Sequence, residues 1–301
     1  MPHFDRGSSY SPCTCGRLRH HNNHQLNITT SNRRLLVSLV LFLIFGIIVW
    51  AIAIWSEIFF PGHNLFPAFM RSSLMAGLLA MTFYLNYRLA AKNELGAGAL
   101  VFRAGFVKQY LGGIILGFLL PVTIWTITYL IFPFEILKNA DARVDWVTVV
   151  ISYCLGNTLE ELLFRGFLLL AVLKLFGKAG GVIFVSLLFG LFHLPGLGFT
   201  QEGLVMIMTT FSMSILFIAV IIYTRSIWTA VFLHITGNLL LHTVGFDGGT
   251  GGLLLIKFSA PLINGAVITV IYETVVVGFA LCLFFKSKQH SSGSRSWPNC
   301  E

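Results

Sequence analysis

Long apolar runs separated by short polar segments restrict this chain to a fold built in lipid. An α-helix needs about 20 apolar residues to cross about 30 Å of hydrocarbon, and in lipid its backbone groups must be hydrogen bonded within the segment. Runs of that length lie at residues 35–55, 69–89, 110–132, 146–174, 204–224 and 261–285, and two shorter runs lie at 181–194 and 227–244. The sequence therefore predicts an all-α, polytopic membrane bundle of eight transmembrane helices.

Composition supports this class and suggests an orientation. Charged residues make up 11% of the 301 residues, whereas soluble proteins carry about 25%. The net charge of +8 fits the excess of Lys and Arg in cytoplasmic loops of membrane proteins, so no nucleic-acid partner is expected. With the N-terminus inside, the inner segments hold fifteen basic residues and the outer segments four, namely Arg71, Lys138, Arg143 and Lys257. Both termini are therefore predicted to be cytoplasmic.

Polar segments flank the apolar region. Residues 1–32 are rich in Ser, Asn and His and are predicted to be a disordered cytoplasmic tail, with a metal site at CTC and HHNNH as the less favoured alternative. Residues 33–286 form the predicted eight-helix membrane domain, with a catalytic core at 145–245, and residues 287–301 form a second disordered tail. The five cysteines show no regular framework, so we expect no structural disulfide.

Three charged residues interrupt the fourth apolar run, in the stretch LEELLFRG at 159–166. A charge near the middle of a bilayer costs at least about 2.5–3.5 kcal/mol on insertion scales. Glu161 and Arg165 are spaced i, i+4, so they share a helix face and can neutralise each other. Glu160 points about 100° away around the helix and lacks such a partner. An intramembrane carboxylate of this kind indicates a functional site.

Two later runs carry polar pairs at helical spacing, Phe189 with His193 and His234 with Asn238. A rise of about 1.5 Å per residue places Glu160 roughly 9 Å and His234 roughly 10 Å from the inner edge of the hydrocarbon. Asn238 falls at roughly 16 Å and His193 at roughly 18 Å by the same count. A lone histidine on an apolar helix is more often a packed core residue, but polar groups from three helices at similar depth favour one shared site.

A carboxylate, two imidazoles and a carboxamide in a water-poor pocket suit the hydrolysis of an amide bond. Glu160 is the candidate general base, and His193 is expected to help hold the attacking water. His234 and Asn238 can donate hydrogen bonds to the oxyanion that develops on the scissile carbonyl. The residues therefore predict a hydrolytic site with a glutamate-activated water and a His/Asn oxyanion hole.

These residues resemble the three motifs of the CPBP family, which includes the type II CAAX prenyl endopeptidases and bacterial Abi-type proteins. The motifs, in order on separate helices, are Glu160-Glu161-x-x-x-Arg165, Phe189-x-x-x-His193 and His234-x-x-x-Asn238. The resemblance covers about residues 145–245 and implies an intramembrane endopeptidase in which a glutamate and a histidine activate water. Glu161 and Arg165 are then expected to fix the rotation of their helix. Phe189 is expected to support the catalytic residues without taking part in the reaction.

The resemblance also implies a substrate and a setting. The substrate would be a membrane-embedded or lipidated protein or peptide, such as one with a prenylated CAAX-type terminus, in the plasma membrane of a bacterium or archaeon. Family members are often labelled metalloproteases, but the chain has no HExxH on one helix. Glu160, His193 and His234 could supply three zinc ligands; we prefer the interpretation without a metal or other cofactor.

Two other functions stay open. A non-catalytic membrane protein, for instance an immunity or scaffold partner, could keep the pocket for binding. A proton-coupled transporter could use Glu160, His193 and Glu273, although the sequence shows no inverted repeat and an interhelical hydrogen bond is the simpler role for Glu273. His242 lies one helical step beyond Asn238 but outside the three motifs, and we expect it to be packed or to face a loop.

Overall fold

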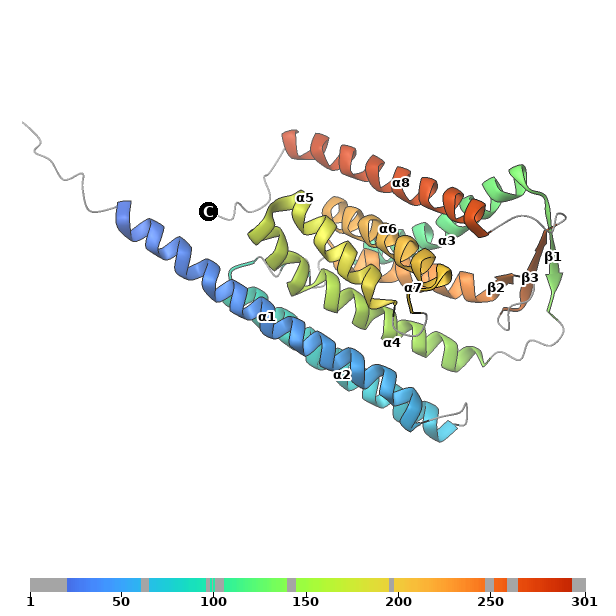
Figure 1. Cartoon of the computed structure of the whole chain (residues 1–301), viewed down its shortest axis with the longest axis horizontal. Coiled ribbons are helices and arrows are strands. Elements are labelled where there is room, and N and C mark those ends of the chain that lie inside the picture. The colour runs from blue at the N-terminus through green and yellow to red at the C-terminus, as the bar shows by residue number, and fades with distance from the viewer. Residues whose placement is uncertain are drawn as a thin grey trace, which may run out of the picture.

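Helices make up most of the computed structural model, which describes residues 21–60, 65–95, 98, 100, 106–139, 145–194, 198–246, 252–258 and 265–293. They are α1 (His21–Phe59), α2 (Leu65–Lys92), α3 (Phe106–Ile131), α4 (Trp146–Arg165), α5 (Phe167–Phe192), α6 (Gln201–Thr224), α7 (Ile227–Thr243) and α8 (Gly265–Gly293). In Figure 1, α1 and α2 run side by side, and α8 lies on the far side of the bundle from them. The predicted all-α class is confirmed, and each predicted apolar run overlaps a helix.

Much of the surface of these helices is apolar, as lipid contact requires. Ile47 on α1 is 65% exposed and Leu130 on α3 is 75% exposed. Six helical stretches among the described residues are long and apolar enough to cross a membrane: Thr30–Ser56, Phe66–Lys92, Val107–Ile131, Trp146–Phe192, Gln201–Thr224 and Val267–Ser287. The protein is therefore a multi-pass membrane protein. Helix α7, with 17 residues, is shorter than these six stretches.

The predicted single helix over 146–174 is wrong, because the chain breaks at Gly166 between α4 and α5. Gly166 has φ −78° and ψ −125°, and the backbone N–H of Phe167 donates a hydrogen bond to Oδ1 of Asn86 on α2. A Cβ at position 166 would collide with the same Asn86 side chain. Because a backbone N–H freed within lipid needs a partner, the buried asparagine makes the break possible.

A second break lies at Gly177, where α5 turns back on itself. Gly177 has φ 72° and ψ 179°, a backbone conformation that favours glycine. Beyond the turn Gly181 packs against Leu173, and a Cβ on Gly181 would lie 2.8 Å from Cδ2 of Leu173. Residues 167–176 and 178–192 therefore pack against each other, and the second of these segments carries the predicted histidine motif.

A small sheet at one end of the bundle is absent from the sequence-based prediction (Figure 1). It contains β1 (Phe134–Lys138), β2 (Val244–Phe246) and β3 (Leu254–Phe258) in the order β1-β3-β2. Strand β3 pairs antiparallel with β1 and parallel with β2. Strands this short show too few residues for a recognisable alternation. Because β1 precedes α4 and β2 follows α7, the sheet ties the start of α4 to the end of α7.

Helix α7 is held on one side by α3. Gly113 and Gly117 of α3 lie against the α7 backbone, where a Cβ on each would come within 2.5 Å and 2.6 Å of the carbonyl oxygens of Thr229 and Leu233, respectively. Small residues four apart let membrane helices approach this closely. The close contact fixes the position of α7 and leaves its neighbouring face, which carries His234, to pack against α4.

Helical structure extends beyond the limits predicted for the membrane domain. Helix α1 begins at His21, inside the segment predicted as the N-terminal tail, and α8 continues to Gly293. Residues 1–20 and 294–301, which hold much of the two predicted tails, lie outside the described residues. The CTC motif of the alternative metal site lies outside them too.

Candidate active site

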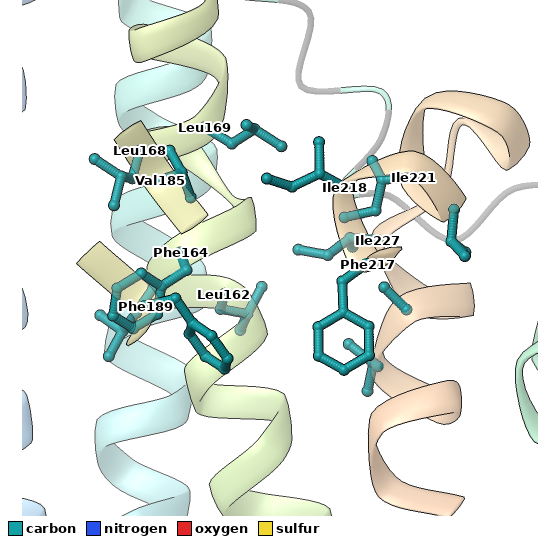
Figure 2. Close-up of a cluster of buried hydrophobic side chains, with 14 of the residues drawn as sticks. Leu162, Phe164, Leu168, Leu169, Val185, Phe189, Phe217, Ile218, Ile221 and Ile227 are labelled. Atoms are coloured by element: carbon teal, nitrogen blue, oxygen red, sulfur yellow. The ribbon is translucent and has the colours of Figure 1, made fainter. Parts of the chain in front are cut away.

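The polar residues of the three motifs lie where α4, α5, α6 and α7 pack around one apolar core. Figure 2 shows part of this core, with labelled side chains Leu162, Phe164, Leu168, Leu169, Val185, Phe189, Phe217, Ile218, Ile221 and Ile227. None of these side chains is more than 7% exposed. A polar group inside such a core must be hydrogen bonded or paired, since its burial otherwise costs free energy. The pairs that the polar groups form therefore define the site.

Arg165 lies inside this core with Glu161 as its counter-ion. Its Nη1 donates a hydrogen bond of 3.2 Å to Oε1 of Glu161, and both side chains are fully buried. The guanidinium carbon lies 3.9 Å from the ring centroid of Phe189 and 5.1 Å from that of Phe217. Cation–π contacts are strongest where the cation is desolvated. The predicted Glu161–Arg165 pair is thus confirmed, and aromatic rings surround it.

His234 of α7 connects this pair to Glu160. Its Nδ1 lies 2.9 Å from Oε1 of Glu161, and since an ionised carboxylate only accepts hydrogen bonds, Nδ1 carries a proton. Its Nε2 lies 3.9 Å from Oε2 of Glu160. The imidazole ring also packs against Phe217, with centroids 4.8 Å apart. One imidazole therefore lies between the two glutamates, and Glu161 sets its orientation.

The two adjacent glutamates differ in their accessibility. The side chain of Glu161 is 0% exposed, and its Oε1 contacts both Arg165 and His234. The side chain of Glu160 is 26% exposed. A water molecule or a substrate can therefore reach the Glu160 carboxylate but not that of Glu161.

Asn238, one helical turn beyond His234, contacts a residue that the sequence-based prediction omits. Its Nδ2 donates a hydrogen bond of 3.3 Å to Oδ1 of Asn157 on α4, and Asn157 is only 4% exposed. Asn157 precedes Glu161 by four residues, so the two share a face of α4. An asparagine within an apolar run, one turn before the glutamates, is the signal that could have identified it.

Near the site, His193 contacts Phe189, which also lies near His234. Its Nδ1 donates a hydrogen bond of 2.8 Å to the carbonyl oxygen of Phe189, which leaves Nε2 as the nitrogen available to water or substrate. The Phe189 ring lies 4.7 Å from the ring of His193 and 6.3 Å from that of His234. Among the described residues, Glu160 makes its ion-pair contact with His234 and none with His193. The structure thus brings Glu160 and His234 into contact, and the Phe189 ring lies near both imidazole rings.

Two polar residues expected outside the site are accounted for by local contacts. Nδ1 of His242 lies 3.3 Å from the hydroxyl of Tyr153, and its ring packs against Trp146 with centroids 6.2 Å apart. The Glu273 carboxylate on α8 accepts a hydrogen bond from the Ser212 hydroxyl on α6. His242 is therefore packed and Glu273 forms an interhelical hydrogen bond, as expected for both.

The donor groups of the site do not fit a metal ion. Within the ranges that the structure describes, no three His, Cys, Asp or Glu side chains form a group that could hold one. A catalytic zinc usually has three protein ligands. The hypothetical zinc set of Glu160 and the two histidines is not assembled, so no chemical step is assigned to a metal.

Residues 142–240 match the family model described as Type II CAAX prenyl endopeptidase Rce1-like. The matched range contains Glu160, His193, His234 and Asn238, and it covers α4, α5, α6 and most of α7. No curated protein matches the chain. The family match therefore falls on the four helices that surround the site.

Proposed function

We propose that this protein, whose residues 142–240 form an Rce1-like type II CAAX prenyl endopeptidase domain of the CPBP family, is an intramembrane endopeptidase. It hydrolyses a peptide bond in a lipidated or membrane-embedded substrate, with prenylated CAAX-type peptides as the first candidates. The observation that carries the proposal is the contact between Glu160 and His234. There a partly exposed carboxylate faces an imidazole that the buried Glu161 holds in place.

Glu160 acts as the general base. It takes a proton from a water molecule that Nε2 of His193 helps to hold, and the resulting hydroxide attacks the scissile carbonyl carbon. Glu160 then gives the proton to the amide nitrogen as the C–N bond breaks, so its carboxylate is restored. The 26% exposure of the Glu160 side chain supports this role, because a base must be within hydrogen-bond reach of its water.

His234 and Asn238 stabilise the oxyanion of the tetrahedral intermediate. Because Nδ1 of His234 is engaged by Glu161, Nε2 is the atom that donates to the oxyanion, and this requires a doubly protonated ring. Asn238 donates through its second N–H. Donors held in place before the reaction stabilise the transition state most effectively.

The proposed arrangement in the membrane has eight helices, with both termini in the cytoplasm of a bacterium or archaeon. The reversal at Gly177 supports it, because it divides the 47-residue stretch Trp146–Phe192 into parts that pack against each other. The excess of basic residues in the inner segments supports the orientation. Cytoplasmic tails at 1–32 and 287–301 flank the membrane domain at 33–286, with its catalytic core at 145–245. Glu160 then lies in the cytoplasmic half of the bilayer.

Cleavage of a prenylated peptide tests the proposed function. The purified protein in detergent should release the C-terminal fragment of a farnesylated CAAX-type peptide, as measured by mass spectrometry. The same peptide without the prenyl group should be cleaved more slowly, because each buried CH₂ adds about 0.8 kcal/mol of affinity for the lipid phase. A chelator should leave the rate unchanged, since the site residues do not gather a metal-binding set. Binding of the peptide without cleavage would instead favour the non-catalytic alternative.

Reporter fusions test the proposed orientation. A reporter fused after Lys286 should lie in the cytoplasm, and one inserted near Arg143 should lie outside, because the basic residues divide fifteen to four between the two sides. Alkaline phosphatase and green fluorescent protein fusions, which are active on opposite sides of the membrane, provide the measurement. If both positions reported the same side, the proposed number of membrane helices would be wrong.

A further inference from the structure

Side chains of α4 and α7 pair in a single antiparallel register. The three pairs are Glu161 with His234, Asn157 with Asn238 and Tyr153 with His242, at 2.9, 3.3 and 3.3 Å. The residues on each helix are four apart, so each step back along α4 is matched by one step forward along α7. The middle pair is therefore held in register from both sides.

The Asn157–Asn238 hydrogen bond controls the orientation of the Asn238 carboxamide. Nδ2 of Asn238 donates to Oδ1 of Asn157, so one of its N–H groups is committed and the other has a defined direction. The Nδ2 atom of Asn157 is buried and has no hydrogen-bond partner among the described residues. An unpaired buried N–H costs free energy, and an apolar side chain at this position would avoid that cost. The asparagine therefore requires a reason beyond packing.

We infer that Asn157 is a positioning residue of the active site, which holds Asn238 in the orientation that donates to the oxyanion. The inference rests on the proposed function, because only there does Asn238 act as an oxyanion donor. A carboxamide that rotated freely would present its oxygen to the oxyanion as often as its N–H. Since a misplacement of about 1 Å can cost about 10²-fold in rate, the acceptor at position 157 supports catalysis through Asn238.

Asn157→Leu removes the acceptor and keeps a buried side chain of similar size. It should lower kcat on the farnesylated peptide by about 10–100-fold, with KM and the melting temperature in detergent unchanged. Asn157→Asp keeps an oxygen facing Asn238 and should recover most of the lost turnover. Thr158→Val is the matched control and should retain full turnover, because Thr158 is also buried on α4 but its hydroxyl bonds to the Cys154 carbonyl of its own helix.

A double-mutant cycle shows whether Asn157 acts through Asn238. Asn238→Ala should lower kcat by about 10²–10³-fold, as lost oxyanion donors do. Asn157→Leu in that background should cause no further loss, because residues that act through one contact are not additive. Additive losses, full turnover of Asn157→Leu, or no recovery with Asn157→Asp would overturn the inference.

The proposed function and the inference fail in different ways. If the wild-type protein does not cleave the peptide, or if Glu160→Gln cleaves it at the wild-type rate, the catalytic assignment itself is wrong. If Glu160→Gln is inactive while Asn157→Leu is fully active, the enzyme assignment stands and only the role of Asn157 is refuted.

Discussion

Glu160→Gln should lower the turnover of a cleavable peptide by about 10²–10⁴-fold, the usual contribution of a general base. Glutamine keeps the size of the side chain and can still contact His234, whose Nε2 lies 3.9 Å from the Glu160 carboxylate, but it cannot take a proton from water. Folding should be unaffected, because Glu160 is partly exposed and Arg165 is paired with Glu161. The measurement is the initial rate of cleavage beside a melting curve in detergent.

Glu202 provides the matched control for this substitution. It is an exposed carboxylate in the first turn of α6, so Glu202→Gln removes the same charge away from the site and should leave turnover unchanged. A Glu160→Gln protein that is folded and inactive supports Glu160 as the base. Full turnover of Glu160→Gln would remove Glu160 from this role, and a loss that only follows unfolding would make Glu160 a residue needed for folding rather than the base.

Contacts along one helix could be predicted from residue spacing. Glu161 and Arg165 pair as their i, i+4 spacing indicates, and the same spacing brings the His193 ring against Phe189. Such predictions succeed because a buried charge requires a partner and the helix offers few positions for one. The similar depth predicted for Glu160 and His234 also agrees with their 3.9 Å contact.

Contacts between helices, and the breaks that they allow, could not be predicted in this way. The break at Gly166 depends on Asn86, which lies 81 residues before Phe167 in the sequence, and glycine alone does not indicate a break because it is common in membrane helices. The role of Asn157 could not be predicted either, because its hydrogen-bond partner Asn238 lies on another helix, α7. Periodicity identifies the faces of a helix but not which faces meet.

Arg165→Ala should destabilise the protein more than any other substitution proposed above, because Arg165 combines charge balance with packing. Its guanidinium pairs with Glu161 and lies 3.9 Å from the centre of the Phe189 ring. Without it, Glu161 becomes a buried carboxylate that has lost its arginine partner, and removing one partner of a buried pair costs about 3–5 kcal/mol. The melting temperature in detergent and the yield of folded protein should both fall along with turnover.

A second variant separates the effect of the unpaired Glu161 carboxylate from the effect of the lost Arg165 packing. Glu161→Gln combined with Arg165→Met removes both charges, keeps an unbranched side chain among the rings, and leaves an oxygen at position 161 that can accept from Nδ1 of His234. Because uncharged groups often replace a buried ion pair without loss of stability, the double variant should melt closer to the wild type than Arg165→Ala does. Arg88→Ala, at an exposed position on α2, gives the baseline for losing a surface arginine. A double variant as unstable as Arg165→Ala would mean that the contacts of the guanidinium with the aromatic rings, and not the charge of Glu161, make Arg165 indispensable.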